Sequence, residues 1–372
     1  MKLPEKDRRK LVQLLGDLAG AVEELLLTGL TTASQATRKR IDVAFREASR
    51  LRLLRLASTL RIAGEELSRY VRKDEGFSRS RLTFFLNRTW LLSRGLARAI
   101  EQDDEEQFAR LLWTPADQPV ERLDVVTLGV VKRVVKGAFC AFEFRLRACR
   151  QAGELEAGSP VTWSCVFPVK PGVDIPPEGF LGLPQKQKFK ASLFLEGKVV
   201  TIVGAAVSAG RRGAGRVSLL PESKVTGGEP FSDWRRFAAW DPRPAIGRLQ
   251  EYRPSPLDLE IELQEEVVLD DWRVEKPDDD RRDHQLVYPG WYRGTPLDLV
   301  VSTSDEAGPV RTYLNRAIRE KSRPPLFGLM HYEMCRLVVE PLSVFEENGP
   351  KHLHVSDDKI DRKALLQAIQ FT

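Results

Sequence analysis

The residues best suited to chemistry in this chain are arginines and lysines, and they are unevenly distributed. Residues 38–98 hold 16 Lys or Arg against 6 Asp or Glu, whereas residues 250–310 hold 6 against 16. The whole-chain net charge of +5 therefore hides a bipolar distribution. A basic stretch either attracts polyanions such as nucleic acid or pairs with an acidic surface, and this chain contains an acidic stretch of its own.

The first basic candidate depends on residues 38–73 forming a single helix. A step of about 100° per residue would then gather five cations within an arc of about 80°. They are Lys39, Arg46, Arg50, Arg61 and Arg72. Such a ridge can neutralise successive phosphates of nucleic acid and release their counterions. The simpler interpretation is a face that is solvated or paired within the chain, because charge runs are common on helical bundles.

A second basic candidate lies in the middle of the chain. On a predicted strand over 188–195 and the residues leading into it, three alternating ammonium groups would project from one face. They belong to Lys186, Lys188 and Lys190. The glycine-rich segment 204–216 adds Arg211, Arg212 and Arg216. Its glycines let backbone amides approach a phosphate and its arginines supply paired donors, although their spacing is not that of a dinucleotide-binding turn. The alternative is a plain connecting loop.

The other candidate sites favour structural interpretations. Aromatic and arginine side chains alternate over residues 231–240, a mixture that can stack on bases, but Trp234 and Phe237 at a spacing of three favour packing. His331, His352 and His354 could meet on a hairpin beside Cys335, yet their spacing is not that of a zinc site, so we expect no metal. No nucleophilic motif is present, and we expect no cofactor and four reduced cysteines.

The elements that must position these residues fall into regions of different periodicity. Residues 5–113 carry successive apolar stripes at spacings of three and four, which predict an N-terminal helical bundle. Beyond Pro115 the period changes to alternation, which predicts a central small β-barrel. If this barrel is of the oligonucleotide-binding type, its loops and one strand face are where single strands bind. The last region mixes strands with helices, including a helix over 359–369, and is α+β.

We therefore expect a multidomain α+β chain, because 372 residues exceed what one core usually supports. The expected parts are a helical bundle over 1–116, a β-barrel-like domain over 120–228, a linker or strap over 229–256 and an α+β domain over 257–372. The proline-rich segment 242–256 is expected to be irregular. No apolar run is long enough to span a membrane and no leader precedes the charged N-terminus, so we expect a cytoplasmic protein.

These observations favour a non-enzymatic cytoplasmic protein that binds nucleic acid with low sequence specificity through a basic surface. Residues 123–226 support this interpretation, because they hold 15 basic residues against 8 acidic ones. The alternative is an adaptor or scaffold subunit whose basic bundle binds an acidic protein partner in a complex. A third class is a hydrolase built around the three histidines. Salt-dependent oligonucleotide binding, a stoichiometric protein partner and bound zinc would distinguish the three.

Overall fold

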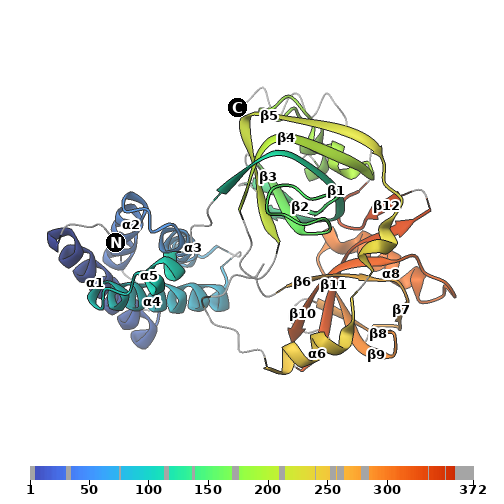
Figure 1. Cartoon of the computed structure of the whole chain (residues 1–372). Helices are drawn as coiled ribbons and strands as arrows, with labels where there is room; N and C mark the ends of the chain where they lie inside the picture. The colour runs from blue at the N-terminus through green and yellow to red at the C-terminus, as the bar shows by residue number, and fades with distance from the viewer. Residues whose placement is uncertain are drawn as a thin grey trace. The chain divides into compact units, whose positions relative to one another are not determined.

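A computed structural model gives the fold of the chain (Figure 1). It describes residues 5–30, 35–74, 77–112, 117–135, 139–169, 176–208, 214–238, 240–251, 257, 264–277, 285–333, 335–347 and 349–356. The chain divides into two compact units, Met1–Pro115 with Ser255–Asp258, and Ala116–Pro254 with Leu259–Thr372. Among the helices in these ranges, none combines the length and apolar character needed to cross a membrane.

The first unit is a bundle of helices, as the apolar stripes predict. Its helices are α1 (Glu5–Thr28), α2 (Gln35–Arg50), α3 (Leu54–Val71), α4 (Arg79–Glu101) and α5 (Glu105–Leu112). Leucines, alanines and isoleucines from all five helices form one buried core. Each helix buries a single apolar stripe in this core, so the stability of the bundle comes from helix packing.

A buried carboxylate fixes the join between α3 and α4. Glu66 has a side chain only 1% exposed, and it pairs with Arg69 at 2.7 Å and with Arg81 at 3.6 Å. Its other oxygen accepts a hydrogen bond from the backbone N–H of Ser78 at 3.1 Å, and the Ser78 hydroxyl in turn caps α4. The charge is therefore compensated by cations and donors, which is the condition for burying a carboxylate without a large cost.

The prediction of a single helix over 38–73 is wrong. The chain reverses at residues 51–53, where Arg52 takes a φ of +57°, and α2 and α3 then pack side by side. Leu53 is buried at the turn, and its backbone N–H donates to the carbonyl of Ala48. No glycine or proline marks this reversal, so the apolar spacing alone suggested a continuous helix.

The second unit begins with a closed barrel of order β1-β2-β3-β5-β4. Its strands are β1 (Asp117–Val135), β2 (Phe139–Ala148), β3 (Pro160–Pro168), β4 (Lys198–Ser208) and β5 (Gly215–Pro230). Neighbouring strands are antiparallel except β3 and β5, which pair in parallel. This closed five-stranded arrangement is the strand order of the oligonucleotide-binding fold.

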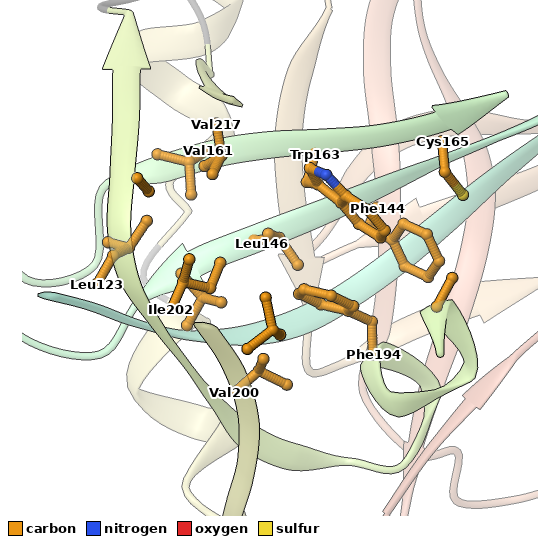
Figure 2. Close-up of a cluster of buried hydrophobic side chains, with 14 of the residues drawn as sticks. Leu123, Phe144, Leu146, Val161, Trp163, Cys165, Phe194, Val200, Ile202 and Val217 are labelled. Carbon is orange, nitrogen blue, oxygen red and sulfur yellow. The ribbon is translucent and has the colours of Figure 1, made fainter. Parts of the chain in front are cut away.

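Aromatic residues fill the barrel between its strands and the short helices η2 (Pro177–Gly182) and η3 (Ala191–Leu195). Figure 2 shows Phe194 of η3 reaching the rings of Trp163 and Phe144, and the Phe194 ring stacks on Trp163 with centroids 4.7 Å apart. The strand predicted over 188–195 is therefore wrong. Lys188 takes a φ of +63°, and its segment makes only one isolated bridge, Pro184 to Lys190, before the chain enters η3.

The remainder of the second unit is a seven-stranded sheet of order β6-β10-β11-β9-β8-β7, with β12 paired to β11. Its strands are β6 (Glu265–Leu269), β7 (Trp272–Val274), β8 (Gln285–Tyr292), β9 (Thr295–Ser302), β10 (Leu326–Glu333), β11 (Arg336–Glu346) and β12 (Gly349–His352). The helix α8 (Gly308–Ala317) packs into its core. A hairpin with its turn before Gly349 pairs β12 antiparallel with β11, whereas the helix predicted over 359–369 lies outside the described residues.

This sheet repeats the strand order of the barrel. Only Asp270 and Asp271 separate β6 from β7, so the two ends of the sheet are consecutive in the chain. If β6 and β7 are counted as one broken first strand, the order is first, second, third, fifth, fourth, and the third and fifth strands, β9 and β11, are again parallel. The second unit therefore holds two sheets of oligonucleotide-binding strand order, and the predicted fold class is confirmed.

The barrel and the sheet share a buried junction. Val126 and Leu128 of β1 pack against Phe327, Leu342 and their neighbours on β10 and β11. Gly129 stands at a register shift of β1, and a Cβ at this position would lie 2.6 Å from the Phe327 ring. The close approach of the two sheets therefore requires a glycine here.

The segment expected to be irregular is in part a helix, α6 (Pro242–Glu251). Prolines are tolerated in the first turn of a helix, where the backbone N–H has no helical partner. Asp241 precedes the helix and accepts a hydrogen bond from the backbone N–H of Arg243 at 3.0 Å. The proline content that suggested a linker is therefore compatible with a helix start.

Candidate nucleic-acid interface

The predicted basic ridge is divided between two helices. Lys39, Arg46 and Arg50 lie on α2, Arg61 lies on α3, and Arg72 caps the end of α3; all five are exposed. Because the chain reverses between the helices, the five cations do not follow one helical face. The unit still exposes them, but as two shorter groups on neighbouring helices.

Two of these cations have local roles. Arg50 pairs with Glu47 one turn earlier at 2.8 Å, and this hydrogen bond together with the charge of Glu47 raises the pKa of Arg50. Lys39 lines a groove of about 510 Å³ between α1 and α2, beside Leu14 and Val43. The side chains of Arg46, Arg61 and Arg72 make no hydrogen bond or ion pair with the part of the chain that the structure describes. These three side chains are therefore available to an external anion.

In the barrel, Lys186, Lys188 and Lys190 lie on a tight turn between η2 and η3. All three side chains are exposed, whereas Phe189 between them is buried in the barrel core. We call these three lysines the lysine turn. The amide of Gln187 donates to the backbone carbonyl of Leu220 on β5 at 3.0 Å and so anchors the turn to the barrel wall. The predicted alternation is present, but it arises in a turn and not in a strand.

Arg216 lies at the beginning of β5, exposed, opposite Ser208 of β4 and Thr162 of β3. It lies four positions before Leu220, the anchor of the lysine turn, which corresponds to roughly 13 Å along a strand. Arg211 and Arg212 lie outside the described residues.

Part of the outer barrel wall is occupied by the chain itself. Arg145 and Arg147 point outward from β2, yet both side chains are buried and pair with Glu266 of β6. Arg145 also pairs with Glu143 at 2.6 Å. These arginines stabilise the junction with the second sheet, and they are not available to phosphate. The accessible cations on the described surface of the barrel therefore include the lysine turn and Arg216.

The aromatic and arginine segment is used for packing, as the spacing predicts. Trp234 is buried and stacks on Phe345 with ring centroids 4.5 Å apart. The Arg236 guanidinium lies over the rings of Phe231 and Phe237 at 5.0 and 4.7 Å. These cation–π contacts close the junction between barrel and sheet, so the segment does not present free aromatic faces.

The three histidines have separate environments. His331 lies 3.5 Å from Glu333, and His354 contacts the carbonyl of Pro341 through Nε2 at 2.9 Å. His352 is buried, neither ring nitrogen has a described partner, and burial lowers the pKa of its imidazole to about 4. Within the described ranges, no three His, Cys, Asp or Glu side chains are placed to hold a metal ion together.

A further group of surface residues was missed in the sequence. Arg273 on β7 pairs across the sheet with Trp291 on β8, and Trp291 pairs with Pro296 on β9. Directly paired residues project on the same side of a sheet, so a guanidinium and an indole lie side by side. Eighteen residues separate Arg273 from Trp291, and only the strand register brings them together. The available signal was the group of three aromatic residues Tyr288, Trp291 and Tyr292.

No known protein family matches the sequence, and no curated protein matches it either. Among solved structures, one similar to this chain is the Ifi202 HINa domain in complex with 20-base-pair double-stranded DNA, at 11% identity and a TM-score of 0.30, covering 63% of this chain and 97% of that one. Another is p202 HIN1 in complex with 12-mer double-stranded DNA, at 11% identity and a TM-score of 0.28, covering 64% and 94%.

A third is a murine DNA-binding protein bound to double-stranded DNA, at 8% identity and a TM-score of 0.26, covering 60% of this chain and 93% of that one. Likenesses of this size do not assign a ligand to the present chain. The fold assignment rests on the strand order of the two sheets, and the candidate interface rests on the exposed cations described above.

Proposed function

We propose that this chain is a non-enzymatic, cytoplasmic protein that binds nucleic acid with low sequence specificity. The observation that carries the proposal is the lysine turn, which holds three exposed ammonium groups against a barrel of oligonucleotide-binding strand order. Arg216 extends the positive surface along β5. A cationic groove on such a barrel follows the phosphates of a single strand, which supports binding there.

The chemistry of these side chains supports low specificity. Lysine ammonium groups contact phosphates as point charges, and contacts to phosphate carry no sequence information. Arg46, Arg61 and Arg72 of the bundle, together with Lys39, Arg50, Arg211 and Arg212, are further candidate phosphate contacts in this proposal. Each phosphate that a cation neutralises releases condensed counterions, so the affinity must fall steeply with salt.

The test is a titration of single-stranded oligonucleotide by fluorescence anisotropy at several salt concentrations. Replacing all three lysines of the lysine turn by Gln should flatten the slope of log K against log salt by about 2, at about 0.7 per phosphate. If the wild type and the variant bind equally at 1 M salt, this difference in slope corresponds to about 100-fold weaker binding by the variant at 0.1 M. The lysines are exposed, so the stability of the fold should not change.

The matched control removes the same number of positive charges from the second unit. Arg243, Arg248 and Arg316 pair with Asp241, Glu265 and Glu320 at 3.1, 2.8 and 3.1 Å. Because carboxylates compensate these arginines, their replacement by Gln should leave the salt slope unchanged. If the control lowers the slope as much as the lysine variant does, net charge alone drives binding and the proposed surface is wrong.

An adaptor or scaffold subunit is the second candidate. The observation that favours it is the groove between α1 and α2, where Leu14, Leu18 and Ala21 form an apolar lining and Val43 is 56% exposed. Apolar surface of this kind is typical of a protein-binding site. A protein that co-purifies stoichiometrically with the wild type, but not with Val43→Glu, would favour this candidate, provided that oligonucleotide binding is absent.

A further inference from the structure

Arg273 and Trp291, paired across β7 and β8, border a pocket of about 540 Å³ on the second sheet. Besides Arg273 and Trp291, the lining includes Asp271, Glu275 and Arg323. The volume is within the range of sites that hold small ligands. Trp291 is half-buried and belongs to none of the buried hydrophobic clusters, so the indole is not used to pack the core.

The charged groups of this pocket are not all engaged within the protein. The Nε of Arg323 donates to the carbonyl of Ala317 at 2.8 Å. In contrast, the side chains of Asp271, Arg273 and Glu275 make no hydrogen bond or ion pair within the described ranges. A guanidinium and two carboxylates therefore face the pocket beside an aromatic ring, with donors and acceptors unused.

The backbone beneath the pocket is closely packed. A Cβ at Gly290 would lie 2.6 Å from the carbonyl oxygen of Arg273, so β7 and β8 can approach this closely only because residue 290 is glycine. The backbone N–H of Glu275 donates to the carbonyl of Pro289 at 2.8 Å and extends the pairing past the end of β7. Arg273 and Trp291 are therefore held on a fixed frame, which suits a preorganised binding site.

We propose that this pocket holds one unstacked nucleobase of a single-stranded segment, an inference that rests on the nucleic-acid binding proposed above. The base stacks on Trp291, and Arg273 contacts the adjoining phosphate. Asp271 and Glu275 accept hydrogen bonds from exocyclic amino groups, which adenine, guanine and cytosine carry and which thymine and uracil lack. The pocket lies on the second sheet, so it would add a contact distinct from that of the lysine turn.

The experiment compares the full-length wild type with Trp291→Ala by anisotropy, using single-stranded homopolymers and a duplex of equal length. Loss of one base stack should weaken binding of oligo-dA or oligo-dC by about 5- to 150-fold, and binding of the duplex should not change. The salt slope should be the same for both proteins, because stacking releases no phosphate counterions. Trp291→Phe should retain most of the affinity, since phenylalanine keeps a ring.

The control is Tyr332→Ala, which removes an aromatic side chain 38% exposed on β10, outside the pocket. This variant should bind like the wild type. Unchanged single-strand binding by a folded Trp291→Ala variant would overturn the pocket assignment and leave the proposed function intact. Failure of the wild type to bind any oligonucleotide at low salt would overturn the proposed function itself.

Free adenosine monophosphate supplies a further arm. If it binds the wild type as tightly as oligo-dA does, and Trp291→Ala removes only the mononucleotide binding, the site serves a free nucleotide and the single-strand assignment is wrong. If the strand binds much more tightly than the mononucleotide and both depend on Trp291, the pocket is a subsite of a longer path.

Discussion

Replacing Gly129 by Ala should weaken the junction between the barrel and the sheet. The added Cβ would lie 2.6 Å from two carbons of the Phe327 ring and 2.9 Å from Cβ of Leu342. Ordinary contacts between such carbons begin near 3.5 Å, so the ring must move by about 1 Å. Phe327 is fully buried and has no solvent-exposed position to occupy. Overpacking of this kind costs about 1–3 kcal/mol in the free energy of unfolding.

The cause can be isolated with a double-mutant cycle measured by urea denaturation. Phe327→Ala alone should cost about 3–5 kcal/mol, since it leaves a cavity at the junction. In that background Gly129→Ala should cost at least about 1 kcal/mol less than it does in the wild type, because the clash with the ring is removed and only the 2.9 Å approach to Cβ of Leu342 remains. Gly182→Ala is the control, as no atom lies within 4 Å of its Cβ position. Strictly additive costs would refute the steric explanation.

Three further predictions concern the stability of the fold. Glu266→Gln should lower the free energy of unfolding by about 3–5 kcal/mol, because the buried guanidinium of Arg147 loses the carboxylate it pairs with and Arg145 keeps only Glu143; a loss below about 1 kcal/mol would show that these ion pairs are unimportant. Burial lowers the pKa of His352 from 6.5 to about 4, so its neutral form contributes stability above pH 6.5 that is lost as the pH falls toward 4. The loss is on the order of 3 kcal/mol, and His352→Leu should flatten the stability curve in this window when denaturation is followed from pH 7 to pH 4. A fragment of residues 1–115 should be helical by circular dichroism and melt cooperatively, and an unfolded fragment would contradict its independence.

The sequence predicts the classes of structure well, because periodicity follows directly from what each element buries. The apolar stripes through Leu11, Leu60 and Leu96 mark helices that share one core. The alternation through Phe142 and Phe144 marks a strand with one face inside the barrel. Both signals depend on local geometry alone, so one amino-acid sequence is sufficient to detect them.

Reversals without glycine or proline could not be predicted in this way. Arg52 and Lys188 adopt positive φ values although neither is a residue that favours them, and surrounding contacts impose the turns. The second sheet was only partly predicted because its first strand is broken at Asp270 and Asp271, and because Pro289 and Gly290 interrupt the pattern of β8. Breaks of this kind remove the alternation before a strand can be recognised.

Only those parts of the candidate site that depend on local sequence could be predicted. Exposure of the lysine turn followed from alternation, since Phe189 needed a buried position whatever the element. The pairing of Arg145 and Arg147 with Glu266 joins residues about 120 positions apart. No local sequence pattern can indicate a contact over that distance in the chain. Register between distant strands also creates the Arg273 and Trp291 pair. Long-range geometry of this kind requires the assembled sheets.

The most direct test of the proposed function is to measure which lysines a bound strand protects. The full chain would be acetylated briefly with and without a single-stranded oligonucleotide, and each lysine quantified by mass spectrometry. We predict slower modification of Lys186, Lys188 and Lys190 in the complex. The exposed Lys10 on α1, which is not a proposed contact, should react unchanged and serve as an internal control. Bound oligonucleotide that leaves the lysine turn as reactive as before would contradict the account.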